Sequence, residues 1–206
     1  MSLQVKSLHK SFNQSKILDN ISFELPASSL MLVSGENGIG KSTFLSCLAG
    51  MLDYDLGEVT LNEQIPDAAF QGSNLYLYED LTILENLMLY ARLLKINNVL
   101  NYVQNLISHF LLSDFADKKI RNCSYGIRKR TSLARVALFA KELIILDEPE
   151  VGLDNKAQEL LLSYIKAQKE QGAVIIIASH DSALYSKLLT HAFSLNSGSY
   201  TFGAKQ

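Results

Sequence analysis

A glycine-rich stretch, GENGIGKS, limits the fold of this chain more than any other feature. It fits the pattern G-x-x-x-x-G-K-[ST] and lies between the apolar run Leu30–Ser34 and the helical pattern of Lys41–Leu52. In such a loop, backbone N–H groups and the N-terminus of the next helix converge on one phosphate, which requires a strand before the loop and a helix after it. We therefore expect an α/β core. The loop and the helix start comprise Gly35, Glu36, Asn37, Gly38, Ile39, Gly40, Lys41, Ser42 and Thr43.

Two side chains of this stretch suit a nucleoside triphosphate. The ammonium group of Lys41 can bind the β- and γ-phosphates, and the hydroxyl of Ser42 can ligate Mg²⁺. The alternative is a glycine-rich turn with a chance Lys-Ser pair, which the flanking strand and helix disfavour. By itself, the motif predicts only that a nucleoside triphosphate binds here.

Two adjacent carboxylates, Asp147 and Glu148, end a second apolar run at Leu143–Leu146. In an open parallel sheet, ligands collect at the carboxyl ends of the strands, where the phosphate loop also lies. We expect Asp147 to hold Mg²⁺, directly or through water, and Glu148 to orient or deprotonate the attacking water. The alternative is a surface-exposed acidic strand end, and the accompanying phosphate loop favours the catalytic interpretation.

The stretch NCSYGIRKR, just before a helix predicted at Arg128–Ala140, narrows the assignment. It resembles the signature of the ABC ATPase family, usually LSGGQ followed by basic residues, and it keeps the serine and the second glycine. The resemblance implies that two modules face each other head to tail. Ser124, Tyr125 and Gly126 would then contact an ATP bound to the second module. Taken alone, Ser124 is better explained as an ordinary helix N-cap.

Two later segments match further landmarks of that family. Gly152–Asp154 resembles the D-loop, which assigns Asp154 to the site. Ile175–Asp181 resembles the strand that leads to the switch histidine, so His180 is expected to hydrogen-bond the γ-phosphate and sense its loss. A lone histidine after a strand is otherwise a plain loop residue. Because the motifs occur in family order along most of the chain, it is identified as a member of the ABC ATPases.

Two landmarks are less clear. Phe12 follows the first predicted strand and matches the aromatic residue that stacks on adenine in this family, although an ordinary core phenylalanine is the alternative. The family's Q-loop glutamine would fall at Ser73, and Gln71 stands two residues earlier. We take Gln71 as the candidate for that role, with a shifted loop or a lost role as alternatives.

The expected fold class is α/β. It has a P-loop NTPase core with a mostly parallel sheet, and the resemblance implies an antiparallel N-terminal β part. Apolar residues recur at helical intervals from Ile83 to Leu112, which predicts an inserted helical subdomain. We expect one ABC ATPase domain over residues 1–206, with residues 1–71 and 141–206 forming the core and about 72–140 the helical subdomain.

Composition excludes several classes of protein. The formal net charge of −2 gives no electrostatic reason to expect nucleic acid as a partner. The two cysteines, Cys47 and Cys123, lack the spacing of a zinc site or a disulfide framework, which favours a reducing compartment. No run approaches the roughly 20 apolar residues of a membrane-spanning helix, and the N-terminus lacks a secretory pattern. We expect no direct membrane insertion.

The resemblance implies an ATPase that uses ATP and Mg²⁺ and works as a dimer, which we expect to be a homodimer. Its expected partner is an integral membrane transport subunit, docked near Tyr76–Asn86, which would place the chain peripherally on the cytoplasmic face of the inner membrane. An ABC ATPase of a soluble machine is the alternative, disfavoured because tandem modules and a long coiled-coil insertion are both lacking. A P-loop kinase is disfavoured by the signature, the D-loop and the histidine together.

Among transporter ATPases, the short chain resembles that of bacterial haem export and cytochrome c maturation. The Gly72-Ser73 segment is similar to the Gly-His segment of those proteins. Their signature is usually LSAGQ, however, and CSYGI is closer to that of other small exporters of drugs, peptides or lipids. The transported substrate stays open, because in this family the membrane subunit recognises it.

Overall fold

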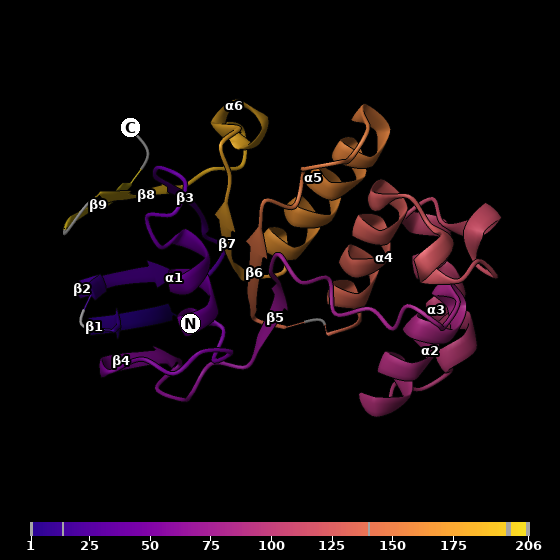
Figure 1. Cartoon of the computed structure of the whole chain (residues 1–206), viewed down its shortest axis with the longest axis horizontal. Helices are drawn as coiled ribbons and strands as arrows, with labels where there is room; N and C mark the ends of the chain where they lie inside the picture. Colours follow the sequence, from indigo (N-terminus) through magenta and orange to yellow (C-terminus); the bar gives the residue numbers. More distant parts are fainter. Residues whose placement is uncertain (1, 14, 140, 197–198, 205–206) are drawn as a thin grey trace. The chain divides into compact units, whose positions relative to one another are not determined.

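The computed structural model describes residues 2–13, 15–139, 141–196 and 199–204. The chain divides into two compact units (Figure 1). Ala140, the last residue expected in the helix that follows the signature, lies outside the described residues, as do Met1 and Gln206. The first unit comprises Met1–Ser73, Lys141–Glu148 and Ile165–Gln206, and the second comprises Asn74–Ala140 and Pro149–Tyr164.

The first unit contains an antiparallel sheet of three strands in the order β2-β1-β4. Its strands are β1 (Ser2–Phe12), β2 (Ser15–Pro26) and β4 (Leu56–Leu61). β1 runs over 11 residues, but its side chains do not alternate regularly between buried and exposed along that length. Leu3 and Val5 are buried two residues apart, but the next buried residue is Leu8, three residues on, because the pairing with β2 shifts register after Val5. The alternation of buried and exposed residues that identifies a strand in a sequence is therefore interrupted.

The same unit contains a six-stranded sheet in the order β5-β6-β7-β3-β8-β9, parallel except for the last strand. Each residue of the strands β6 and β7 is buried, as is usual for near-continuous apolar strands inside a parallel sheet. The expected fold class, mostly parallel with an antiparallel N-terminal part, is confirmed. The strands are β3 (Leu30–Ser34), β5 (Ala68–Gln71), β6 (Leu143–Asp147), β7 (Val174–Ala178), β8 (His191–Asn196) and β9 (Ser199–Ala204).

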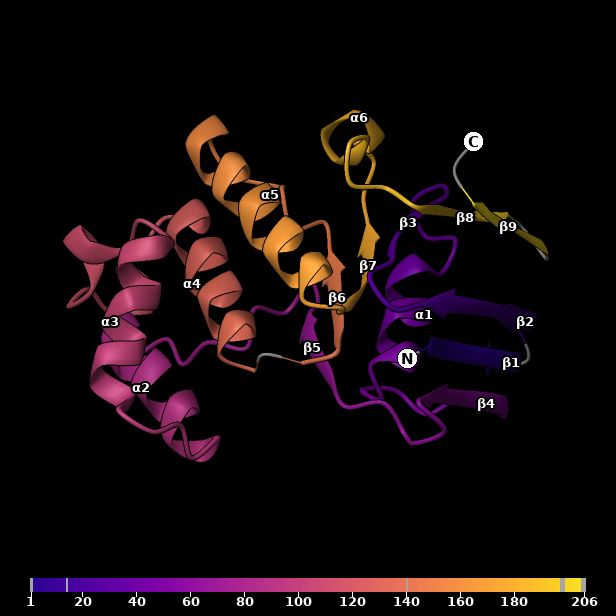
Figure 2. The same cartoon turned by 180° about the vertical axis from the view of Figure 1, so that it is seen from behind.

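Helix α1 (Lys41–Leu48) joins the two sheets through aromatic packing. The ring of Phe44 stacks on Phe193 of β8 at 4.7 Å between centroids and meets Phe23 of β2 edge-on at 6.1 Å. Figures 1 and 2 show α1 beside β1 and β2. The helix ends before the predicted Leu52, because the amides of Met51 and Leu52 both turn back to the carbonyl of Ser46.

The second unit is helical and is built from α2 (Ile83–Leu93), α3 (Val99–His109) and α4 (Tyr125–Leu138) (Figure 2). Thr82 and Glu85 form a capping box at the start of α2. Helix α4 begins three residues before the predicted Arg128, because Ser124 is its N-cap. Two short 3-10 helices, Ser113–Phe115 and Ile120–Asn122, precede it.

Two further helices follow the carboxylate strand. Helix α5 (Asn155–Glu170) begins in the second unit and ends in the first. The short helix α6 (Ser182–Tyr185) follows β7. None of the helices in the described part of the chain is both long and apolar enough to cross a bilayer.

Candidate functional site

The phosphate loop joins β3 to α1 and folds around the side chain of Lys41. The ammonium group donates hydrogen bonds to the carbonyls of Gly35 at 2.8 Å and Glu36 at 3.0 Å, and the residue is 7% exposed. Gly40 has a φ of 113°, and a Cβ added there would lie 2.5 Å from Cγ2 of Ile17. Only glycine fits this position, which seats the loop against β2.

The first turn of α1 carries Lys41, Ser42 and Thr43. Gly40 is its N-cap and makes no side-chain capping hydrogen bond. The first N–H groups of a helix have no partner within the helix, so an anion is attracted to them and to the positive end of the helix dipole. The Ser42 side chain is exposed at this turn, as a metal ligand needs to be.

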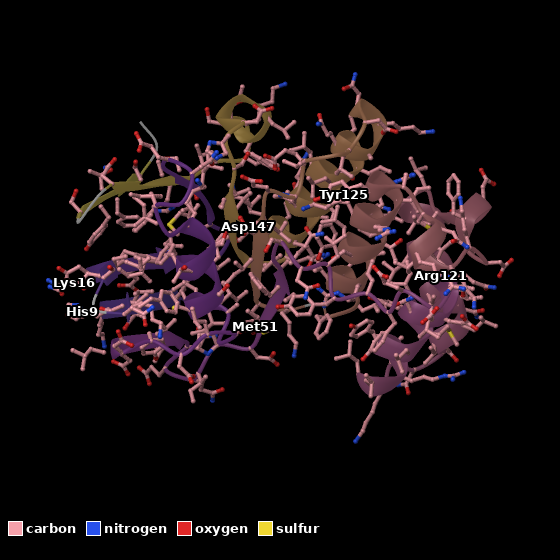
Figure 3. All side chains as sticks on the ribbon, in the orientation of Figure 1. His9, Lys16, Met51, Arg121, Tyr125 and Asp147 are labelled. Atoms are coloured by element: carbon pink, nitrogen blue, oxygen red, sulfur yellow. The ribbon has the colours of Figure 1, made fainter. Side chains whose placement is uncertain are left out.

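The two carboxylates lie at the end of β6. Asp147 is the last residue of the strand and is 7% exposed, and Figure 3 labels it there. Glu148 has a left-handed backbone with a φ of 47°, and its amide donates to the carbonyl of Ala178 at 2.8 Å. This conformation is rare for residues other than glycine, and such residues are often found at functional sites. Here it occurs at the first residue after β6.

His180 lies between the phosphate loop and the carboxylate of Glu148. Its Nε2 atom is 3.0 Å from Oδ1 of Asn37 and 3.6 Å from Oε1 of Glu148. The side chains of His180 and Glu148 are 53% and 41% exposed, so a substrate can reach both. Three segments far apart in sequence therefore place these residues together, within the first unit.

Gln71 ends β5, where it pairs with Leu146, the neighbour of Asp147. It is fully buried, and neither its amide oxygen nor its amide nitrogen has a hydrogen-bond partner among the described residues. A buried amide without a partner costs free energy, so this side chain is suited to a ligand.

The residues of this site fit Mg²⁺. The metal prefers oxygen ligands and is usually bound by one or two carboxylates together with phosphates and water. The oxygens that could hold the ion are those of Ser42, of Asp147 and of the Gln71 amide, which has no partner among the described residues. A cluster of three or more His, Cys, Asp or Glu side chains is absent from the described residues, and a nucleotide-bound magnesium ion needs none.

Phe12 lies within β1 as its last residue, and not after the strand as predicted. Its ring is 45% exposed, which excludes the alternative of a core phenylalanine. Lys10 lies over the ring with Nζ 5.1 Å from the centroid, and Asp55 pairs with Lys10 at 3.4 Å. The exposed ring is free to stack on a base.

Ser124, Tyr125, Gly126 and Asp154 all lie in the second unit. The Ser124 hydroxyl accepts a hydrogen bond from the Ile127 amide at 3.4 Å, and the Asp154 carboxylate accepts one from the Ala157 amide at 2.8 Å. Ser124 is thus a helix N-cap, as the simpler alternative held, and Asp154 makes the same kind of contact at the start of α5. A cavity of about 330 Å³ borders both segments.

Sequence reasoning missed two contacts of the site. It placed Asn37 in the phosphate loop but gave it no link to His180, and it did not single out Ile17, against which Gly40 packs. Both contacts join segments far apart in the chain. They depend on sheet pairing and loop conformation, which a local pattern does not reveal.

Known proteins resemble this chain in both sequence and fold. The family profile described as ABC transporter matches residues 18–151. The cytochrome c biogenesis ATP-binding export protein CcmA of Reclinomonas americana is 30% identical over 80% of this chain and 78% of its own length. The Nod factor export ATP-binding protein I of Cupriavidus metallidurans is 28% identical over 95% of this chain and 68% of its own.

Other relatives differ more in length. The linearmycin resistance ATP-binding protein LnrL of Bacillus subtilis is 27% identical over 86% of this chain, which spans 61% of it. The ribose import ATP-binding protein RbsA of the same species is 26% identical, and the chain spans 40% of it. A solved structure titled as the ATP-binding subunit of an ABC transporter matches with a TM-score of 0.90, 24% identity, and coverage of 99% of this chain and 90% of the other.

The structural match establishes the fold, and the family profile, together with the relative from Reclinomonas americana, establishes the family. The phosphate loop, the strand-end carboxylates and the histidine contact described above are the features expected of an ATP-binding subunit. The chain belongs to the ABC transporter family of ATP-binding proteins.

Proposed function

We propose that this chain binds and hydrolyses ATP as the motor subunit of a membrane ABC transporter. The main support for hydrolysis is that three side chains lie close together. His180 lies between Asn37 of the phosphate loop and the carboxylate of Glu148. A phosphate-binding loop alone binds a nucleotide, whereas a carboxylate and an imidazole beside it can act on the terminal phosphate.

Binding uses the loop and the aromatic residue of β1. The amides of the first turn of α1 and the ammonium group of Lys41 bind the phosphates, and Phe12 stacks on the base. A bound Mg²⁺ would neutralise charge on the β- and γ-phosphate oxygens, and Ser42, Asp147 and Gln71 would hold it.

Hydrolysis uses Glu148 as the general base. Its carboxylate takes a proton from water while the water oxygen forms a bond to the γ-phosphorus. The bond between that phosphorus and the β–γ bridging oxygen breaks, and the bridging oxygen leaves on ADP with the electron pair. His180 would donate a hydrogen bond to the γ-phosphate and would lose that bond when phosphate departs.

A second copy of the chain completes the site in this proposal. Ser124, Tyr125 and Gly126 of one subunit would face the ATP held by the other, with Asp154 beside them. ATP would favour the closed homodimer and hydrolysis would release it. The chain would act as one ABC ATPase domain with a helical subdomain at about residues 72–140, to which a membrane transport subunit binds on the cytoplasmic face of the inner membrane.

We propose that the transporter serves haem export or cytochrome c maturation. The support is the relative named for cytochrome c biogenesis, which matches this chain over most of the length of both proteins. Relatives named for Nod factor export and linearmycin resistance support an exporter of lipids, drugs or peptides as the second candidate.

One experiment tests both levels of the proposal. Tagged Glu148→Gln protein is purified from native membranes in Mg-ATP, with Lys41→Ala protein as the control whose affinity for ATP is lowered. Co-purifying chains are identified by mass spectrometry. A multi-span membrane protein captured with Glu148→Gln supports the transporter, and cytochrome c maturation components support the narrower proposal. Ribosomal or DNA-repair proteins in its place would reject the transporter.

A further inference from the structure

Tyr125 packs its ring on the backbone of Gly152. A Cβ added at Gly152 would lie 2.5 Å from Cδ1 and 2.7 Å from Cε1 of the tyrosine. These distances are far shorter than a carbon–carbon contact allows, so only the missing side chain lets the ring come this close. The tyrosine is 52% exposed, so it touches Gly152 without entering the core, and Figure 3 labels it.

The next residue makes a second contact with the same glycine. A Cβ added at Gly126 would lie 2.7 Å from the carbonyl oxygen of Gly152. Gly152 itself has a φ of 80° and lies in a turn closed by a hydrogen bond from the Leu153 amide to the Glu150 carbonyl at 3.1 Å. Two successive residues in the first turn of α4, Tyr125 and Gly126, therefore pack against the loop at Gly152.

Both segments border one cavity of about 330 Å³. Asp154 follows Gly152 by two residues and caps α5 through the Ala157 amide. Ser124 and Asp154 both line this cavity, so a group that fills it borders both residues. The lining of the cavity includes Ser124, Gly126 and Arg130 of the first segment and Gly152 and Asp154 of the second.

We propose that Tyr125 is a positioning residue that joins the signature segment to the Asp154 segment, so that ATP contact at Ser124 displaces Asp154 with it. This inference rests on the proposed ATPase function. The family pattern LSGGQ has glycine at the position of Tyr125. A glycine there would leave Gly152 uncovered, so this link depends on the tyrosine of this chain.

The ring provides the link because it is rigid and has two rotatable bonds at most, so little conformational entropy opposes the contact. Its polar tip is not needed for that role. Removing the ring should uncouple the two segments and reduce turnover, whereas removing only the hydroxyl should not. The affinity for ATP should change less than turnover, because the phosphate loop and the Lys41 ammonium group, which hold the nucleotide, are not altered by substitutions at Tyr125.

The test is a double-mutant cycle on the ATPase activity of the full chain. We expect Tyr125→Ala to lower kcat about fivefold, with a change in KM of less than about twofold. Tyr125→Phe should regain most of the lost kcat. Gly152→Ala should lower kcat by a larger factor in the wild-type chain than in the Tyr125→Ala chain, because its new methyl group collides with the ring only when the ring is present.

The strained φ of Gly152→Ala is the same in both backgrounds, so it cancels from the cycle. Tyr102→Ala, an exposed tyrosine on α3, is the matched control. Independent effects of the two substitutions, or unchanged kcat in Tyr125→Ala, would overturn the inference. If Gly152→Ala does not fold, the comparison of Tyr125→Ala with Tyr125→Phe decides. A wild-type chain without ATPase activity would instead refute the proposed function.

Discussion

The Nε2 atom of His180 lies 3.0 Å from Oδ1 of Asn37, so the phosphate loop and the segment after β7 are joined by a side-chain hydrogen bond. With an amide oxygen as acceptor, Nε2 carries the proton. This fixes the ring orientation, with the same nitrogen 3.6 Å from the Glu148 carboxylate. The imidazole is thus aligned by the loop that binds the phosphates.

Loss of this hydrogen bond should lower turnover more than binding. We expect Asn37→Ala to reduce kcat about tenfold, the effect of one lost hydrogen bond of about 1.4 kcal/mol. The affinity for ATP should change less, because Lys41 and the helix amides remain. Phosphate release and equilibrium nucleotide binding measure the two quantities. Asn101→Ala, on the exposed side of α3, should leave both unchanged, and an equal loss in both for Asn37→Ala would contradict this role.

Replacing the general base should separate binding from hydrolysis. Glu148→Gln keeps the shape of the side chain but cannot accept a proton from water, so kcat should fall about 10²- to 10⁴-fold. ATP binding should persist, and the dimer should accumulate in size-exclusion chromatography with Mg-ATP. Glu159→Gln on α5 is the control. Unchanged turnover in Glu148→Gln would remove this residue from the mechanism.

The phosphate loop should depend on Lys41 for affinity itself. Lys41→Ala removes the ammonium group whose bonds to the Gly35 and Glu36 carbonyls hold it at the centre of the loop. We expect the Kd for ATP to rise about tenfold or more, since a hydrogen bond to a charged group contributes about 1.5–3 kcal/mol. Titration calorimetry measures it, with the exposed Lys187→Ala as control. Normal affinity would reject the phosphate-cradle assignment.

Gln71 should show opposite effects on stability and activity. Its amide is buried without a partner, so Gln71→Met should raise the free energy of unfolding by about 1 kcal/mol or more. The same change removes an oxygen from the proposed metal site, so Mg²⁺-dependent turnover should fall. Urea unfolding without nucleotide and a magnesium titration of ATPase activity test both. A stabilised variant with unchanged magnesium dependence would assign Gln71 no role in catalysis.

The buried thiol of Cys47 should be inert in the native protein. Burial raises its pKa from 9.0 to about 11, so the reactive thiolate is scarce at neutral pH. Because the unfolded thiol ionises near 9, its contribution to stability is lost as pH rises toward 11. A Cys123→Ser chain should react with a disulfide reagent at pH 8 only after denaturant is added. Rapid native reaction would show that this part of the core opens.

The buried strands of the fold could be predicted from sequence, and the short or exposed ones could not. β3 occupies the range of its apolar run, Leu30–Ser34, and β7 lies within the segment expected to lead to His180, because an all-apolar run between polar turns has few alternative structures. β5, with the sequence AAFQ, has neither alternation nor β-branched residues, and it went unpredicted. The hairpin of β8 and β9 was missed as well.

The candidate site could be predicted only as far as its motifs extend. The two carboxylates and the histidine lie at the end of an apolar strand or just after one, so their gathering at one sheet edge follows from parallel topology. The contact of His180 with Asn37 and the seating of Gly40 on Ile17 depend on loop conformation. The predicted start of α4, Arg128, was three residues too late, because Gly126 is a poor helix former and its presence argued against a helix at that point.

The position of β6 and β7 inside the sheet determines how rarely the backbone next to the site unfolds locally. All five residues of each strand are buried, and neighbouring strands flank both edges. Amides in such strands exchange with deuterium only when the surrounding structure unfolds cooperatively. Glu148 follows the first strand directly and His180 lies two residues beyond the second. The reacting groups are therefore attached to the most slowly exchanging part of their unit, and their spacing persists for as long as that unit stays folded.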